Sequence, residues 1–380
     1  MNRERTRTVE GGAGCTPGIQ AVHFPDKQST GGSASERIPG LSDSVIVVTR
    51  NRTAALRDIC LPALAQQETR AARELIICDA SDDRATEELI GAWSAAHPDW
   101  PTLYLRAERA GTCSQRNQAS AAAHGDIVLF LDDDLELLLG GLDELLDAFR
   151  RDGGHEYAGF ECTLVEPPEL STHPGHSPLL RALWRAAMHL FGLPTHTGAR
   201  VVLPSGFPDG TGAKLRSLIP DLRASPGAIQ DAEWFRGCCM AFRRTLFVSD
   251  NISSDTRLER FGGYALAEDI LLCVTVRKRT GRKLGQCSGA LAVHYALPGG
   301  RCNERARGAM LAYNIWHVWS AAGPSSPGRR FQWLRGQAGQ VAISARYGGL
   351  QRLHGLVDGW RAIARETHHP VPVTGQDGTR

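Results

Sequence analysis

Residues 126–136 combine an apolar run with an acidic cluster. The apolar part, residues 127–131, is long enough for one buried strand, and Asp132, Asp133 and Asp134 follow it directly. A parallel strand covered on both faces is apolar throughout, and ligands of open α/β sheets bind beyond the carboxyl ends of the strands. Three adjacent carboxylates repel one another unless a cation or hydrogen bonds offset their charge. The stretch therefore predicts a buried parallel strand that ends in an acidic binding site.

Two interpretations of this acidic cluster are open. Mg²⁺ and Mn²⁺ take oxygen ligands, typically one or two carboxylates together with the oxygens of a substrate diphosphate. The alternative is a solvated acidic turn at the start of a helix over residues 137–151, because negative charge is favoured at a helix N-terminus. The rest of the chain has to decide between a metal site and a helix cap.

The composition is that of an ordinary globular protein. Its 380 residues are 42% hydrophobic and 22% charged, and the net charge of +2 gives no argument for a nucleic-acid partner. None of the ten cysteines forms a C-x-x-C pair, and Cys60, Cys78, Cys162 and Cys273 lie in apolar stretches. This pattern favours a reducing cytoplasm over a disulfide framework. Because no apolar stretch has membrane-spanning length and the N-terminus lacks an apolar signal core, we expect a soluble, cytoplasmic protein.

Strands and helices alternate in the first half of the predicted fold. Residues 1–41 are rich in Gly, Ser, Thr and charge, and we expect a disordered leader there. Predicted strands cover residues 45–48, 74–79, 102–106 and 127–131, with helices around 56–64, 85–96 and 111–124 between them. Such alternation implies right-handed crossovers and a mostly parallel sheet, with polar strand ends gathered at one edge.

The second half of the chain is less regular. Residues 163–228 are rich in Pro and Gly, and we expect an irregular insertion that shapes an acceptor pocket, with one helix around 179–191. A strand after Gly237, a helix ending at Arg279 and a strand over 283–293 are predicted to follow. Residues 321–380 are predicted to form a basic helical extension with a disordered tail.

The ordered motifs resemble those of family 2 glycosyltransferases, nucleotide-sugar enzymes with a GT-A fold. The resemblance covers about residues 43–320 and implies a catalytic domain over 42–320. Its motifs are residues 45–51, Cys78-Asp79-Ala80-Ser81-Asp82, Arg116-Asn117, Leu131-Asp132-Asp133-Asp134, Trp234-x-x-Gly237 with Arg243-Arg244, Glu268-Asp269, and His294. The detail, including Tyr313-Asn314, is most similar to the bacterial rhamnosyltransferase-like branch. Leu271 stands where that branch usually has a second aspartate, which leaves the sugar open.

The resemblance assigns the strand-end residues to the nucleotide and a metal. It implies that Asp132 and Asp134 are the aspartates of a D-x-D motif, the first reaching the ribose or the metal and the second binding Mn²⁺ or Mg²⁺ at the diphosphate. Asp79 would contact a uracil or thymine base. Further nucleotide contacts are implied for Thr49, Arg50, Asn51 and Arg116, with solvated surface charge as the alternative for Thr49 and Arg50.

The same resemblance assigns the reacting groups. Asp269 matches the general base that takes the proton of the acceptor hydroxyl, which implies inversion at the anomeric carbon. Glu268 either binds the acceptor or caps a helix. His294 is either a metal or phosphate ligand or a structural histidine. Trp234 and Gly237 would line the sugar pocket, although core packing is the alternative for Trp234.

The implied function is therefore transfer of a sugar from a UDP- or dTDP-sugar to an acceptor hydroxyl, in cell-wall, polysaccharide or natural-product glycosylation. The acceptor is a saccharide, a lipid-linked molecule or a small molecule. Three alternatives stay open: a non-catalytic binding or scaffold protein, a nucleotidyltransferase, and a retaining transferase. A nucleotidyltransferase is disfavoured because no Gly-rich basic loop follows the first strand, and a P-loop hydrolase because G-x-x-x-x-G-K-[ST] is absent.

Residues 329–365 carry seven arginines and a single acid, Asp358. A basic amphipathic helix of this kind can lie on an anionic membrane surface, which would place the protein peripherally at the inner membrane face. The alternative is that it packs on the catalytic domain with its arginines solvated.

Overall fold

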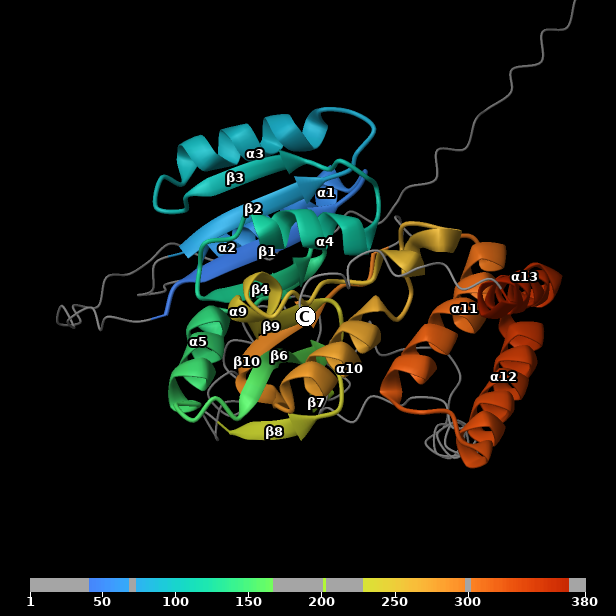
Figure 1. Ribbon diagram of the computed structural model, residues 1–380. Helices are drawn as coiled ribbons and strands as arrows, with labels where there is room; N and C mark the ends of the chain where they lie inside the picture. Colours follow the sequence, from blue (N-terminus) through green and yellow to red (C-terminus); the bar gives the residue numbers. More distant parts are fainter. Residues whose placement is uncertain (1–40, 68–72, 167–200, 203–227, 298–301, 369–380) are drawn as a thin grey trace, which may run out of the picture.

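The computed structural model describes residues 41–67, 73–166, 201–202, 228–297 and 302–368 (Figure 1). The first half of the chain forms four parallel strands of the central sheet, in the order β3-β2-β1-β4. The strands are β1 (Asp43–Thr49), β2 (Arg73–Asp79), β3 (Thr102–Arg106) and β4 (Ile127–Asp132). The helical segments between them are α1 (Thr53–Ala55), η1 (Leu56–Cys60) and α2 (Leu61–Ala65), then α3 (Ala85–Ala96) and α4 (Thr112–Ala121).

The second half continues the same sheet in the order β4-β9-β6-β10-β5. β9 is antiparallel to both β4 and β6, whereas β10 is parallel to β6 and antiparallel to β5 and β8. The strands are β5 (Leu135–Leu137), β6 (Tyr157–Glu166), β7 (Val201–Val202), β8 (Ile229–Ala232), β9 (Cys239–Arg243) and β10 (Lys283–His294). The helices are α5 (Gly141–Arg151), α9 (Thr245–Val248), η2 (Thr256–Phe261) and α10 (Glu268–Thr280). The predicted fold class, an α/β fold with a mostly parallel central sheet flanked by helices, is confirmed.

The acidic cluster does not cap a helix. Asp133 and Asp134 form the turn between β4 and β5, and the helix expected from residue 137 begins only at Gly141. Residues 135–137 pair with the end of β10 instead, with His294 opposite Leu135. The helix-cap interpretation is therefore wrong, because the carboxylates lie between two strands.

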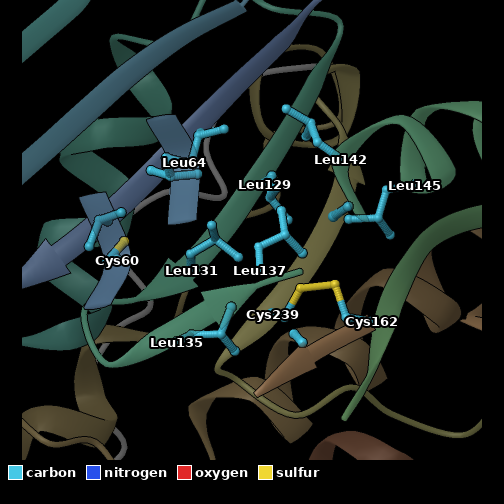
Figure 2. Packing of buried hydrophobic residues seen from close by; sticks show 14 of the residues in the cluster. Cys60, Leu64, Leu129, Leu131, Leu135, Leu137, Leu142, Leu145, Cys162 and Cys239 are labelled. Atoms are coloured by element: carbon cyan, nitrogen blue, oxygen red, sulfur yellow. A yellow bond between two sulfur atoms is a disulfide. The ribbon is translucent and has the colours of Figure 1, made fainter. Parts of the chain in front are cut away.

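The sheet is buried on both faces, which explains why its strands read as continuous apolar runs. Along β4, Leu129 and Leu131 point to one face and Val128 and Phe130 to the other, and all four are at most 2% exposed. Figure 2 shows the first face, where Leu129 and Leu131 meet side chains of β5 and α5, among them Leu135, Leu137, Leu142 and Leu145. Each such side chain contributes about 2 kcal/mol through burial.

Two cysteines form a disulfide, although the sequence favoured free thiols. Cys162 on β6 and Cys239 on β9 form a disulfide within the first apolar cluster (Figure 2). Their Cα atoms lie 5.9 Å apart because the two strands are adjacent and antiparallel, although 77 residues separate them in sequence. Cys60, Cys78 and Cys273 are buried free thiols, as the sequence predicted.

Three helices follow β10: α11 (Glu304–Ala322), α12 (Pro327–Tyr347) and α13 (Gly349–His368). α12 and α13 lie within the extension predicted over 321–380, whereas nearly all of α11 lies within the predicted catalytic domain. α11 contacts α10 and packs along α13, while α12 contacts both α11 and α13 (Figure 1). In the part of the chain that the structure describes, no helix is long and apolar enough to cross a membrane. Residues 1–40 of the predicted leader, nearly all of the insertion at 163–228 and the tail beyond 368 lie outside the described residues.

Candidate active site

Three potential metal ligands meet where β4 and β10 end. Asp132 closes β4, Asp134 lies in the turn after it, and His294 closes β10. One ligand atom from each lies within 4.8 Å of the others. Nε2 of His294 is 3.2 Å from Oδ1 of Asp134 and 3.6 Å from Oδ2 of Asp132. β4 and β10 are not neighbours in the sheet, and it is the pairing of β5 with β10 that brings these residues together.

The donor set fits a divalent cation. Carboxylate oxygens suit Mg²⁺ and Mn²⁺, and an imidazole nitrogen favours the transition metal over Mg²⁺. Asp134 is poised as a charged ligand: its burial raises its pKa, but hydrogen bonds and charges from His294 and Arg52 outweigh that and lower the pKa to about 2. The residues present therefore fit the metal that the sequence predicted, with Mn²⁺ ahead of Mg²⁺.

Arg52 and Asp133 complete this turn, and sequence reasoning assigned neither of them a role. Nη2 of Arg52 is 2.5 Å from Oδ2 of Asp134, and its Nε is 3.1 Å from Oδ1 of Asp133. The Thr49 hydroxyl donates to Oδ2 of Asp133 at 2.6 Å. Burial raises the pKa of Asp133 to about 7, against the opposing effect of Arg52. Asp133 thus anchors the turn between β4 and β5 to the end of β1. The only feature of the sequence that pointed to Asp133 was its position inside the acidic run.

The predicted nucleotide residues gather at the ends of β1 and β2. Asn51 has a left-handed backbone (φ 55°), and its N–H donates to the Ser81 hydroxyl at 2.7 Å while its side chain and Asp82 exchange hydrogen bonds. Asp79 is fully buried and accepts from the Ser81 N–H at 2.8 Å and from the Tyr104 hydroxyl at 2.9 Å. Arg50 is exposed beside Asp82.

Arg116 connects the metal ligands to the predicted catalytic pair. It is buried on α4, its Nη1 donates to Oε1 of Glu268, and its Nη2 donates to the Gly237 carbonyl at 2.8 Å. Nη2 also lies 3.8 Å from Oδ1 of Asp132. Burial raises the pKa of Glu268 to about 7 even though Arg116 opposes the shift. The guanidinium therefore lies between two sets of carboxylates.

Asp269 is held by backbone amides at the start of α10. Oδ2 accepts from the Gly237 N–H at 2.9 Å, and Oδ1 accepts from the Ile270 N–H at 2.8 Å. Burial raises the pKa of Asp269, and these two hydrogen bonds oppose the rise. Ala265 (φ 46°) and Ala267 (φ 68°) precede the helix in left-handed conformations that are unfavourable for alanine. Strain of this kind collects at functional sites.

Trp234 lies between β8 and β9, three residues before Gly237. Its side chain is partly buried and packs against the second apolar cluster of the sheet, which contains Phe235, Phe242 and Cys273. This packing favours the alternative that Trp234 is part of the core. Gly237 contacts the predicted catalytic pair directly: its N–H donates to Asp269, and a Cβ there would lie 3.1 Å from Oε1 of Glu268.

Residues 44–182 match the family model of Glycosyl transferase family 2. The match covers a little over a third of the chain and includes Asp79, Arg116, Asp132 and Asp134. It confirms the predicted enzyme class, a glycosyltransferase. No curated protein matches the chain.

Solved structures resemble the chain at low identity. One is TarS 1-349 from S. aureus in complex with UDP-GlcNAc, 17% identical over 85% of this chain and 82% of that chain, with a TM-score of 0.49. Another is the mannosyltransferase PcManGT from Pyrobaculum calidifontis in complex with GDP-Man and Mn²⁺, 17% identical over 90% of this chain and 85% of that chain, with a TM-score of 0.47.

Proposed function

We propose that the chain is a metal-dependent, inverting glycosyltransferase that moves a sugar from a UDP- or dTDP-sugar to an acceptor hydroxyl. The observation that carries the proposal is the convergence of Asp132, Asp134 and His294, linked through Arg116 to the Glu268-Asp269 pair. Metal ligands and a buried carboxylate base are the two parts that direct displacement needs. The family match over residues 44–182 supports the same class.

The metal ligands serve the leaving group. A divalent cation held by Asp132, Asp134 and His294 would supply Lewis-acid stabilisation of the charge on the departing nucleoside diphosphate. Arg52 fixes Asp134 through Oδ2 and leaves Oδ1 to face His294. Arg116 lies 3.8 Å from Asp132 and adds a fixed positive charge near the departing nucleoside diphosphate.

Asp269 serves the acceptor. It takes the proton of the acceptor hydroxyl while the acceptor oxygen forms its bond to the anomeric carbon. The bond from that carbon to the diphosphate oxygen breaks, and its electron pair leaves with the nucleoside diphosphate. Burial raises the pKa of Asp269, which strengthens it as a base. Attack opposite the leaving group inverts the anomeric configuration.

Glu268 contributes an acceptor-facing oxygen. Oε1 is bound by Arg116, whereas Oε2 is buried and has no hydrogen-bond partner in the described part of the chain. A buried carboxylate oxygen without a partner is costly, and a substrate hydroxyl would satisfy it. We assign Glu268 to acceptor binding and Asp269 to proton transfer, because both oxygens of Asp269 are already oriented by backbone amides.

The nucleotide is assigned to the ends of β1 and β2, where Thr49, Arg50, Asn51 and Asp79 lie. Asp79 would accept the imide N–H of uracil or thymine in exchange for one of the hydrogen bonds that its two oxygens receive from Ser81 and Tyr104. The motif pattern is most similar to the rhamnosyltransferase-like branch, and Leu271 leaves the donor sugar open. The intact metal and catalytic residues disfavour a non-catalytic scaffold.

Calorimetric titration of UDP, dTDP and GDP, with and without Mn²⁺, tests the proposal. Wild type should bind a uridine or thymidine diphosphate in a Mn²⁺-dependent manner, and Asp134→Ala should lose that dependence. Asp250→Ala, which removes an exposed aspartate after α9, is the matched control and should bind as wild type does. Absence of binding for all three nucleotides in wild type would reject the enzyme and favour the scaffold. The anomeric configuration of the product, read by NMR, separates inversion from retention.

A further inference from the structure

Helix α12 presents its apolar side chains to solvent. Phe331 is 64% exposed, Leu334 58% and Val341 37%. Three alanines are exposed with them, at positions 338, 342 and 345. Their spacing of three and four residues puts all six on one side of the helix. An ordinary surface helix has the reverse arrangement, with its apolar side buried.

The opposite side of α12 is polar and buried. Gln337, Gln340 and Ser344 are each at most 8% exposed. The amide oxygen of Gln337 accepts a 2.8 Å hydrogen bond from Nε1 of Trp360 on α13. Trp333 packs edge-on against Trp316 of α11, with ring centroids 5.1 Å apart. These contacts fix the rotation of the helix about its axis, so the outward apolar face is a consequence of specific packing.

Arginines border the exposed apolar face, and α12 contains no acidic residue. The helical period places Arg330 on one edge of the face and Arg335 and Arg346 on the other. Arg329 lies on the inward side, where its guanidinium donates to the carbonyls of Trp319 and Pro324. Leu350, 72% exposed at the start of α13, adds a further apolar side chain directly after this helix.

We propose that α12 docks in the plane of an anionic lipid surface. Phe331, Leu334 and Val341 would enter the boundary between headgroups and acyl chains, and the bordering arginines would bind lipid phosphates. An apolar face bounded by basic residues without acids is the chemistry of an interfacial helix. Each basic residue close to an anionic leaflet strengthens binding about fivefold.

A second copy of the chain fits this face less well. Twofold pairing through α12 would bring the bordering arginines of one copy against those of the other, with no acid on either helix to offset them. The helix also does not span the bilayer, since no described helix meets the length and apolarity that spanning requires. The docking proposal concerns α12 alone and is independent of the proposed catalytic activity.

The test is flotation of the full-length chain with vesicles. Vesicles of phosphatidylcholine with phosphatidylglycerol should bind wild type, and vesicles of phosphatidylcholine alone should bind it more weakly. The double variant Phe331→Ser/Leu334→Ser should weaken binding at least about tenfold, because it removes the two most exposed side chains of the face. Val248→Ser on α9, which removes a side chain that is also 58% exposed, should bind like wild type.

A second variant tests how much the charge of the bordering arginines contributes to vesicle binding. Arg330→Gln should weaken binding to the anionic vesicles about fivefold, and should leave binding to neutral vesicles unchanged. Both sites are on the surface, so the far-ultraviolet circular dichroism of all variants should match wild type. Equal binding of wild type and the double variant would overturn the proposal. So would a concentration-dependent oligomer that the double variant abolishes, without vesicle binding by wild type, because the face would then join copies of the chain.

Discussion

The backbone N–H of Gly237 donates a 2.9 Å hydrogen bond to Oδ2 of Asp269, the proposed base. The carbonyl of the same residue accepts from Arg116, so one glycine contacts both the start of α10 and the guanidinium near the proposed metal ligands. A Cβ at Gly237 would lie 3.1 Å from Oε1 of Glu268, 3.4 Å from Oδ2 of Asp269 and 3.5 Å from Nη2 of Arg116. There is thus no room for a larger side chain without displacement of charged groups.

Gly237→Ala should therefore reduce activity far more than stability. The added methyl displaces Oε1 of Glu268 by a few tenths of an ångström, whereas Asp269 stays at an ordinary contact distance. Misplacement of a group that holds the substrate lowers kcat/KM by about tenfold or more. We expect the free energy of unfolding to fall by only about 1 kcal/mol, because flexible carboxylates can yield. Steady-state kinetics and urea unfolding measure the two effects.

Gly91→Ala is the control for that substitution. Gly91 lies inside α3, and a Cβ there meets nothing within 4 Å. Alanine at an unhindered helix position should stabilise by about 0.5 to 1 kcal/mol and leave the kinetics unchanged. If Gly237→Ala kept wild-type kcat/KM, the close packing around the catalytic pair would have no catalytic meaning.

Asp269→Asn should abolish proton transfer, while Glu268→Gln should weaken acceptor binding. Loss of a general base lowers kcat by about 10² to 10⁴, without a matching loss of nucleotide affinity.

Glu268→Gln should raise the KM for the acceptor more than it lowers kcat, since its Oε2 is assigned to an acceptor hydroxyl. If Glu268→Gln mainly lowered kcat and Asp269→Asn mainly raised the KM for the acceptor, Glu268 would be the base and Asp269 the acceptor-binding residue.

The sequence predicted the sheet and its polar edge well because both depend on local pattern. Buried strands such as residues 127–131 have a run of apolar residues that needs no tertiary information. The meeting of Asp132 with His294 came from the family resemblance. Its physical cause, the pairing of β5 with β10, was missed because a helix was expected from residue 137 onward. A three-residue strand is too short to leave a periodic signal.

Contacts between residues that are far apart in the chain could not be predicted from the sequence, for a similar reason. The Cys162–Cys239 disulfide depends on which strands are neighbours, and a separation of 77 residues carries no such information. Arg52 lies in a polar loop like Arg50, yet only Arg52 turns toward the acidic turn. The outward face of α12 was equally hidden, because it depends on how Trp333 and Gln337 pack against neighbouring helices.

Metal affinity should fall as pH falls, through the titration of His294. Burial lowers the pKa of its imidazole, but the hydrogen bond to Asp134 and the charges of Asp132 and Asp134 outweigh burial and raise it above 6.5. Only the neutral imidazole binds a metal, so Mn²⁺ affinity should drop about tenfold per pH unit below that raised pKa. Calorimetric titration of Mn²⁺ between pH 5.5 and 8 measures this slope.

Two histidine variants control for the effect. His294→Gln should bind Mn²⁺ weakly and without this pH dependence, since it removes the titrating ligand. His124→Gln changes a histidine whose side chain is 84% exposed and should preserve the wild-type slope. A wild-type slope in His294→Gln would assign the titration to another group.

Stability should decrease as pH rises from about 4 to about 7, in part because of Asp43. This side chain is 1% exposed, neither of its oxygens has a hydrogen-bond partner in the described structure, and burial raises its pKa from 3.8 to about 7 against the opposing charge of Arg73. Between those values the folded chain holds more protons than the unfolded chain, so the free energy of unfolding falls with rising pH. The full loss from Asp43 is about 4 kcal/mol.

Asp43→Asn should remove this part of the pH dependence. The amide stays neutral across the range, so the variant should lose less stability than wild type between pH 4 and pH 7. Some slope will persist because burial also raises the pKa values of Asp133 and Glu268 to about 7. Urea unfolding at several pH values measures the difference, with Asp250→Asn as an exposed control that should keep the wild-type slope. Parallel curves for Asp43→Asn and wild type would mean that Asp43 titrates at its ordinary pKa in the folded protein.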